Sequence, residues 1–170
     1  MSLNFRKHTL QAYLDQLSLK EPVPGGGSAA ALTATLGAAL ISMVANYSMG
    51  RKNNTKATEA RLAKILQSSE FCRKRLLELT TLDSIAYLNI VASRKADLRT
   101  RKQTARQAAR VGQEVCRLCY KAVGLMPFLV EKGNPYLLSD LEVAIELLMA
   151  GFNSSMVMVK INQPQIYGTK

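Results

Sequence analysis

The sequence predicts an all-α protein, a helical bundle of about five helices that pack up and down around a central alanine-rich helix. Hydrophobic residues make up 48% of the 170 residues but aromatic ones only 6%, so Ala, Leu and Met must fill most of the core. These residue types favour helices over strands. Apolar residues recur at helical spacing along the chain, and no β-hairpin signature interrupts them. The length fits one domain, so we expect residues 1–170 to form a single helical domain.

The first expected helix covers Thr9–Leu19 and is followed by a loop. Two prolines and three glycines between residues 20 and 27 prevent the helix from continuing. The helical spacing of the apolar face comes from Leu10, Tyr13, Leu14 and Leu17.

The second expected helix, from Ser28 to about Met49, carries no charged residue. About 20 apolar residues can span a bilayer, which makes a membrane segment an alternative. The run is rich in Ala, Thr, Ser and Asn and sparse in Leu and Ile, however, which weakens its transfer into lipid. Small residues suit the centre of a bundle, where neighbouring helices approach closely. We therefore expect a core helix and no membrane partner.

Three more helices are expected in the remaining sequence. One runs from residue 55 to about 96, and the next from Leu98 to Glu131, with a bend near Gly112 or Pro127. The last begins near Ser139, which has capping-box spacing to Glu142, and ends near Ile161.

The net charge and the cysteine content restrict the classes of function that fit the sequence. The net charge is +11, and residues 94–121 carry nine of the basic side chains against two acidic ones. Such a block can attract nucleic acid or a small polyacid, or it can be a solvated helix face.

The three cysteines, Cys72, Cys116 and Cys119, form no dense disulfide framework and indicate a reducing compartment. The sequence shows no signal-peptide pattern, so we expect a cytoplasmic location.

A glycine-rich loop is the first candidate for chemistry. Gly25, Gly26, Gly27 and Ser28 lead directly into the uncharged helix. Glycines let a backbone approach a ligand closely, and a helix start presents unpaired N–H groups and a positive dipole end. The loop lacks the ending of a Walker motif. These residues alone are compatible with two interpretations. The loop could bind an anion or a carbonyl group, or it could be a plain loop in which Ser28 caps the helix.

Several blocks of the sequence resemble the formiminotetrahydrofolate cyclodeaminase / methenyltetrahydrofolate cyclohydrolase family of folate enzymes. The blocks cover nearly the whole chain in order. They are Pro22–Ala31 with the following Gly37–Asn46, then Asp83-Ser84-Ile85-Ala86-Tyr87, then Lys132-Gly133-Asn134 with Ser139-Asp140, and finally Val159–Asn162.

The resemblance implies a site and a reaction. Asp83 would be catalytic and would move protons, while Gly25–Ser28 would position the folate. Asp83 is flanked by apolar residues, and a carboxylate buried there must find a partner or shift its pKa upward. An ion pair with one of the many Arg and Lys residues is the alternative. The other implied substrate-binding residues are Tyr87, Lys95, Asn134 and Asp140. The last two have structural explanations as well, because Asn134 shapes a turn and Asp140 suits the first turn of a helix.

The implied activity is either cyclodeamination of 5-formiminotetrahydrofolate or hydrolysis of 5,10-methenyltetrahydrofolate. Neither needs a metal or a cofactor beyond the tetrahydrofolate substrate, whose polyglutamate tail the basic block would attract. The resemblance also implies a homodimer, and a stand-alone enzyme because no stretch resembles a formiminotransferase domain.

The sequence departs from the family pattern at two places, which keeps rival functions open. Family members often have a Leu-Pro-Lys turn where this chain reads Arg94–Asp97, and Val-Pro where it has Val111-Gly112. Lys95 could replace the missing lysine. We expect both changes to fall around the pocket, and a catalytically inactive relative is one alternative. A basic helical nucleic-acid-binding module is the other, although aromatic residues for stacking are scarce near the basic block.

Overall fold

The computed structural model describes residues 4–167, together with the side chains of all of these except residues 164, 165 and 167. It contains six α-helices and two 3₁₀ helices, with no strand in the described range. In chain order the elements are η1 (Phe5–Lys7), α1 (Leu10–Ser18), α2 (Gly26–Ser48), α3 (Lys56–Ser93), α4 (Leu98–Val123), α5 (Met126–Lys132), η2 (Pro135–Leu137) and α6 (Leu138–Tyr167).

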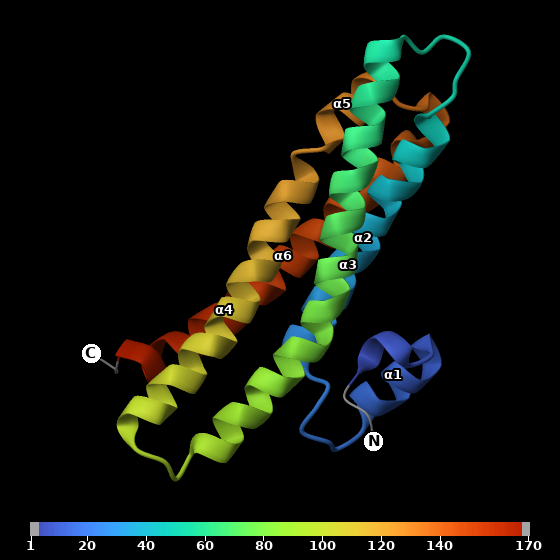
Figure 1. Ribbon diagram of the computed structural model, residues 1–170. Coiled ribbons are helices and arrows are strands. Elements are labelled where there is room, and N and C mark those ends of the chain that lie inside the picture. The colour runs from blue at the N-terminus through green and yellow to red at the C-terminus, as the bar shows by residue number, and fades with distance from the viewer. Residues whose placement is uncertain (1–3, 168–170) are drawn as a thin grey trace.

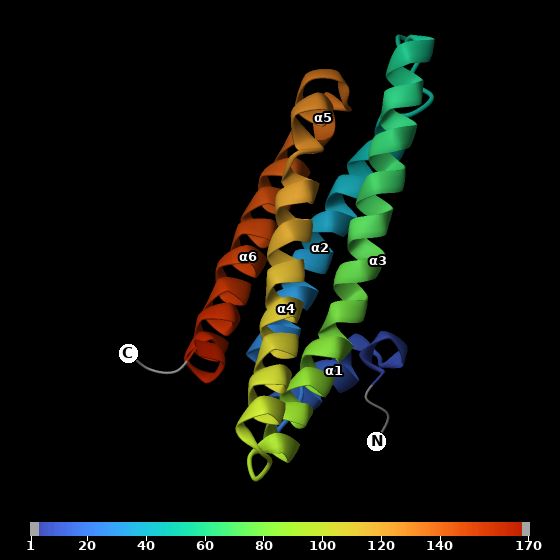
Figure 2. The ribbon, with the colours of Figure 1, turned by 60° about the vertical axis from the view of Figure 1, so that its left-hand side comes forward.

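The four long helices form an antiparallel up-and-down bundle (Figures 1 and 2). Helix α2 lies between α3 and α6, and α4 closes the ring by packing on the same two helices. Short connections after α2 and α3 reverse the chain direction each time, as is usual for up-and-down bundles. One end of the bundle therefore holds the start of α2, the end of α3, the start of α4 and the end of α6. The short helix α1 lies at this end too (Figure 1).

Close contacts between helices explain the small residues of α2 and its neighbours. A Cβ on Gly37 of α2 would overlap Leu148 of α6, and one on Gly151 of α6 would overlap Ala34 of α2. More than half of α2 is buried, with Ala31, Ala34, Ala38, Ile41 and Val44 fully inaccessible. The prediction of an alanine-rich core helix is thus confirmed.

The helix boundaries differ from the predicted ones in three places. Helix α2 begins at Gly26 rather than at Ser28, and α6 extends beyond Ile161 to Tyr167. The helix predicted from Leu98 to Glu131 is divided into α4 and α5 at Gly124 and Leu125. Pro127 is the cause of that division, since its ring fits the first turn of a new helix and not the interior of an old one.

Helix α4 continues without a break through Gly112, so the helix is not interrupted there. A Cβ on Gly112 would meet Val159 at 3.0 Å and the Ser155 carbonyl oxygen at 3.2 Å. Gly112 therefore allows α4 and α6 to approach each other and lies in the bundle wall, not around a pocket as the sequence suggested.

Within residues 4–167, two stretches are long and apolar enough to cross a membrane, by length and composition only. In α2 the apolar window is 61% buried inside the bundle, which fits a core helix. In the stretch Pro135–Gln163 only 28% of the window is buried. Much of the apolar surface of α6 consequently faces outward.

A candidate acid–base site at one end of the bundle

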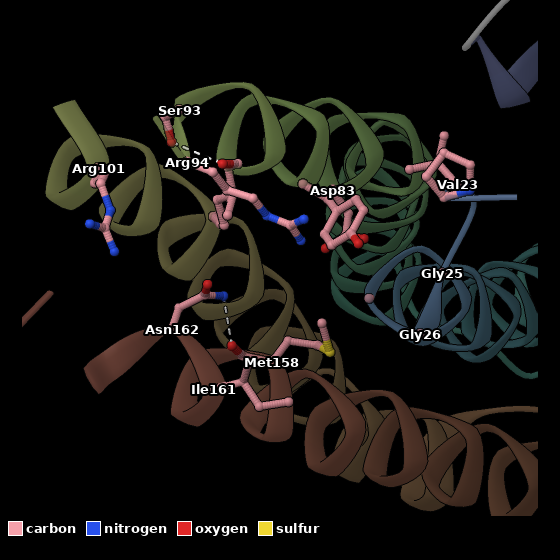
Figure 3. Close-up of a pocket in the computed structure, with 15 residues that line it drawn as sticks. Val23, Gly25, Gly26, Asp83, Ser93, Arg94, Arg101, Met158, Ile161 and Asn162 are labelled. Atoms are coloured by element: carbon pink, nitrogen blue, oxygen red, sulfur yellow. Dashed lines mark hydrogen bonds between the residues drawn. The ribbon is translucent and has the colours of Figure 1, made fainter. Parts of the chain in front are cut away.

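A cavity of about 550 Å³ opens at the end of the bundle where α2 and α4 begin and α3 and α6 end (Figure 3). This volume is in the range of small-molecule sites. Helix ends and loops from the whole length of the chain line it. Its lining includes Gly25, Gly26, Gly27, Asp83, Tyr87, Arg94, Arg101, Met158, Ile161 and Asn162.

The carboxyl group of Asp83 lies directly against the first turn of α2. A Cβ added to Gly27 would overlap the Asp83 carboxylate, so only glycine allows this approach. The carboxylate accepts a hydrogen bond from the backbone N–H of Ser28. A helix start leaves such N–H groups without partners in the helix, and Gly25 at the N-cap has no side chain to satisfy them. Asp83 of α3 thus supplies an acceptor that α2 lacks.

The pKa of Asp83 is raised to about 6, mainly because burial disfavours the charged carboxylate. The Ser28 N–H lowers the pKa but does not offset the burial. No Lys or Arg among the described residues forms an ion pair with Asp83, so the ion-pair alternative for this residue was wrong. A carboxyl group with a pKa near neutral can both take up and release a proton at physiological pH.

Tyr13 of α1 supports the other side of the same helix turn. Its hydroxyl lies 3.0 Å from the Oγ of Ser28, and both side chains are buried. Burial raises the pKa of Tyr13, and the nearby Asp83 raises it further. The Ser28 side chain therefore fixes α1 to the start of α2, whereas its N–H serves Asp83.

Two arginines bring positive charge to the cavity. Arg94 is the C-cap residue that follows α3, and Arg101 lies in the first turn of α4. Both line the cavity, and both belong to the basic block of residues 94–121. Figure 3 shows the Arg94 guanidinium pointing toward Asp83, with Arg101 farther out. The cavity can therefore hold an anionic ligand with its reactive part near Asp83.

The structure brings together five of the nine predicted site residues. Asp83, Tyr87 and the three glycines line the cavity. Ser28 lies behind it, where its hydroxyl contacts Tyr13. Lys95 is exposed in the turn after α3 and does not line the cavity, whereas its neighbour Arg94 does.

Asn134 and Asp140 lie at the opposite end of the bundle. The Asn134 N–H donates to the Oγ of Ser48, which is 2.9 Å away at the end of α2. Because α2 has 23 residues, this end is about 33 Å from the glycines at its start. Asp140 is in the first turn of α6, beside that far end. Neither residue reaches the cavity of its own chain.

Sequence reasoning missed several residues of the site. Met158, Ile161 and Asn162 form the α6 wall, and Asn162 donates to the Met158 carbonyl oxygen at 2.9 Å. Residues 159–162 formed one of the blocks that carried the resemblance, but no charge pattern marked them as site residues. Tyr13 was assigned only to the apolar face of its helix. The hydrophobic spacing predicts that its ring is buried, but it cannot predict that its hydroxyl contacts Ser28.

The described residues include no group of three or more His, Cys, Asp or Glu side chains that could hold a metal ion. The three cysteines are buried and free of disulfides.

The Asp83 carboxyl has a pKa of about 6 and lines a cavity that two arginines also line. A carboxyl group of this kind is typical of an enzyme that uses general acid–base catalysis, and in this protein it lies at the end of a helical bundle. Comparison with known proteins gives the family: residues 9–169 match formiminotransferase-cyclodeaminase, and the chain belongs to that family. The resemblance inferred from the sequence is thus confirmed.

Individual relatives agree with this family. A methenyltetrahydrofolate cyclohydrolase of Methylorubrum extorquens is 32% identical over 164 residues, which cover 91% of this chain and 78% of that protein. A formimidoyltransferase-cyclodeaminase of Rattus norvegicus is 28% identical, and the match covers 91% of this chain but only 30% of that protein. The crystal structure of a formiminotetrahydrofolate cyclodeaminase from Thermotoga maritima superposes with a TM-score of 0.91 at 27% identity, covering 95% of this chain and 81% of that one. The predicted all-α bundle is therefore confirmed.

Proposed function

We propose that this protein is a folate-dependent one-carbon enzyme that acts at the bridge between N5 and N10 of tetrahydrofolate. It would either cyclodeaminate 5-formiminotetrahydrofolate to 5,10-methenyltetrahydrofolate and ammonia, or hydrolyse 5,10-methenyltetrahydrofolate to 10-formyltetrahydrofolate. The observation that supports this most directly is the Asp83 carboxyl, which is held against Gly27 with a pKa of about 6. The names of the relatives point to the same pair of reactions.

Both reactions need one group that accepts a proton and then returns it. In cyclodeamination, the formimino nitrogen enters the reaction protonated, N10 attacks the formimino carbon on N5, and Asp83 takes the proton that N10 loses. Asp83 then gives that proton to the departing nitrogen, the carbon–nitrogen bond breaks, and ammonia leaves. A carboxyl with a pKa near the working pH suits both steps, because neither protonation state is strongly preferred.

Hydrolysis uses the same residue with water as the attacking group. Asp83 takes a proton as water adds to the methenyl carbon, and it then protonates N5 as the bond from carbon to N5 breaks. The hydroxyl on the carbon loses its proton and becomes the formyl oxygen on N10. The methenyl cation and one water thus give 10-formyltetrahydrofolate and one proton.

The remaining cavity groups would bind and orient the substrate. The N–H groups of Gly26 and Gly27 lie in the first turn of α2, where the helix itself provides no acceptor, and they can face a carbonyl of the pterin. Arg94 and Arg101 can bind the carboxylates of the glutamate tail, including those of a polyglutamylated folate. We propose no cofactor beyond this substrate, a homodimeric state and a cytoplasmic location.

The experiment that tests the function is a pair of assays with purified protein. Loss of the ultraviolet band of 5,10-methenyltetrahydrofolate measures hydrolysis, and its appearance from 5-formiminotetrahydrofolate, with ammonia release, measures cyclodeamination. We expect Asp83→Asn to lower the rate by about 10²–10⁴-fold, the usual contribution of a general acid–base group. Circular dichroism of the variant must match the parent protein. Failure of the folded parent protein to turn over either substrate would overturn the proposal.

A further inference from the structure

Tyr13 is the only side chain that α1 buries. It is 5% exposed, whereas Leu10 and Leu14 of the same helix are 68% and 50% exposed. Its hydroxyl lies 3.0 Å from the Oγ of Ser28, which is fully buried. Neither side chain lines the cavity, so this contact cannot act on a substrate directly. It can act only through the residues that it holds in place.

Ser28 is the first residue of α2 that has a side chain, because two glycines precede it in the helix and a third is the N-cap. Glycines have great backbone freedom and offer no side chain through which a neighbour could hold them. The beginning of α2 therefore depends on Ser28 for its first side-chain anchor. The Ser28 N–H is also one of the groups that the helix leaves without a partner, and it donates to the Asp83 carboxylate. Ser28 is thus held by Tyr13 through its side chain and binds Asp83 through its backbone.

Tyr13 is itself positioned by α3, the helix that carries Asp83. The backbone N–H of Phe5 donates to the Oγ1 of Thr81 at 3.2 Å, two residues before Asp83. The Phe5 ring packs edge-on against the Tyr13 ring, with 5.5 Å between their centroids. These contacts lead from α3 through the N-terminal segment to Ser28, and the Ser28 N–H leads back to α3 at Asp83. The closed ring of contacts restrains the N–H relative to the carboxylate from both sides.

We infer that Tyr13 is a positioning residue of the proposed acid–base site, because its hydroxyl holds Ser28 with the backbone N–H directed at the Asp83 carboxylate. The inference rests on the proposed function for the chemistry of the site, whereas the contacts themselves are independent of any substrate. The alternative is a purely structural role, in which Tyr13 only fastens α1 to the bundle. A structural anchor affects the stability of the protein, whereas a positioning residue also affects the protonation of the carboxyl.

Loss of the Tyr13 hydroxyl should raise the pKa of Asp83. The hydrogen bond from the Ser28 N–H favours the charged carboxylate and lowers this pKa, which burial raises to about 6. A Ser28 that is no longer held gives a longer and weaker bond, so the effect of burial increases. The substitution leaves the other groups around the carboxyl unchanged. No charged residue of α2 or of the α6 wall lines the cavity, and the titratable and charged groups that face Asp83 from α3 and α4 are Tyr87, Arg94 and Arg101.

The first test compares the pH profiles of kcat/KM, with either folate substrate, for the parent protein and for Tyr13→Phe. This substitution keeps the ring and removes only the hydroxyl. We expect the acidic limb to move upward from about pH 6 by about 0.5–1 unit. The value of kcat/KM should therefore fall about threefold to eightfold at pH 5.5 and by less than about twofold at pH 8.5, where the carboxyl is ionised in both proteins. A limb that stays in place, including one in a variant whose rate falls equally at every pH, would overturn the inference.

Two control variants separate this effect from a general loosening of the N-terminal segment. Arg6→Ala removes the 2.9 Å ion pair between Arg6 and Glu78, and so loosens the same segment without touching Ser28. Tyr120→Phe makes the same chemical change at a side chain that is 80% exposed on α4. Both should keep the acidic limb of the parent protein. If Arg6→Ala moves the limb as far as Tyr13→Phe does, the hydroxyl has no specific role and the inference is wrong.

Ser28→Ala removes the same contact from the other side and is a second, independent variant. It keeps the backbone N–H, so the acidic limb should move upward as it does in Tyr13→Phe. Because both substitutions break one contact, the limb of the double variant should move no farther than that of either single variant. Shifts that add in the double variant would show that the two side chains act separately, which contradicts the inference.

A final measurement needs no folate and separates the inference from the proposed function. The side-chain carboxyl carbons of carbon-13-labelled aspartate are followed by NMR as the pH changes, and the Asp83 signal is the one that Asp83→Asn removes. We expect this carbon to titrate near pH 6 in the parent protein and about 0.5–1 unit higher in Tyr13→Phe. Equal titration in the two proteins would overturn the inference even if both are active. Absence of turnover in the parent protein would instead remove the proposed function and leave this titration to decide whether Tyr13 positions Asp83.

Discussion

At the scale of single residues, Asp83 shows how a position rather than a residue type creates an acid–base group. An exposed aspartate is fully ionised at neutral pH, whereas burial at the cavity raises the pKa of this carboxyl to about 6. The hydrogen bond from the Ser28 N–H limits the rise. The carboxyl remains able to accept a proton at pH 7 and to return it at little cost.

The pH dependence of the reaction should report this pKa. Both proposed reactions begin with the unprotonated carboxylate, so kcat/KM should fall about tenfold per pH unit below pH 6 and level off above pH 7. Steady-state rates between pH 4.5 and 8.5 measure the profile. A limb near pH 4, the usual range of an exposed carboxyl, would show that Asp83 is not the group that titrates.

The same burial predicts that Asp83 destabilises the fold at neutral pH. Its pKa is higher in the folded than in the unfolded chain, so the folded state binds more protons between about pH 4 and 6 and its stability declines as pH rises through that range. Asp83→Asn should therefore increase the free energy of unfolding by about 1–3 kcal/mol above pH 7 and by little at pH 4. Urea titrations at both pH values measure this difference, and an equal effect at both would argue against a buried carboxylate.

At the scale of helices, hydrophobic spacing predicted which segments are helical. It did not predict where each helix begins or which side chains bind its unpaired backbone groups. Ser28 looked like the cap of α2, yet the helix begins at Gly26 and its first turn is completed by Asp83 from α3. A contact between residues 55 positions apart leaves no local pattern in a sequence. The resemblance to a family marked both the glycines and Asp83, but it could not show that they touch.

Gly27→Ala tests this contact between helices directly. The added methyl group would overlap the Asp83 carboxylate, so we expect the carboxylate to move and kcat to fall at least tenfold. The limb of the pH profile near 6 should shift as well, because the Ser28 hydrogen bond is lost. The control is Gly124→Ala, whose Cβ would meet nothing closer than 3.5 Å at the end of α4. It should retain full activity, and a Gly27→Ala enzyme that behaves like it would contradict the assigned contact.

At the scale of the whole molecule, the up-and-down topology decides which chain segments share an end. It gathers the termini of four long helices around the cavity and includes Arg94 and Arg101 from the basic block. The charge pattern alone left open whether the basic block attracts an anion or is a solvated helix face, whereas the structure places Arg94 and Arg101 of that block at the cavity and leaves Lys95 outside. The same topology separates Asn134 and Asp140 from the cavity of their own chain, which no pattern within one sequence could reveal.

The concentration of positive charge at this end predicts how substrate binding responds to salt. Exposed charges interact over about 8–10 Å at physiological ionic strength and much less at higher salt. The KM for a pentaglutamyl folate should therefore rise several-fold between 50 and 500 mM NaCl, while the KM for the monoglutamyl form changes little. Arg94→Ala should weaken this dependence and Lys95→Ala should preserve it, because only Arg94 lines the cavity. If instead both folates respond equally and double-stranded DNA binds with a steep salt dependence, the basic block serves nucleic acid rather than the folate tail.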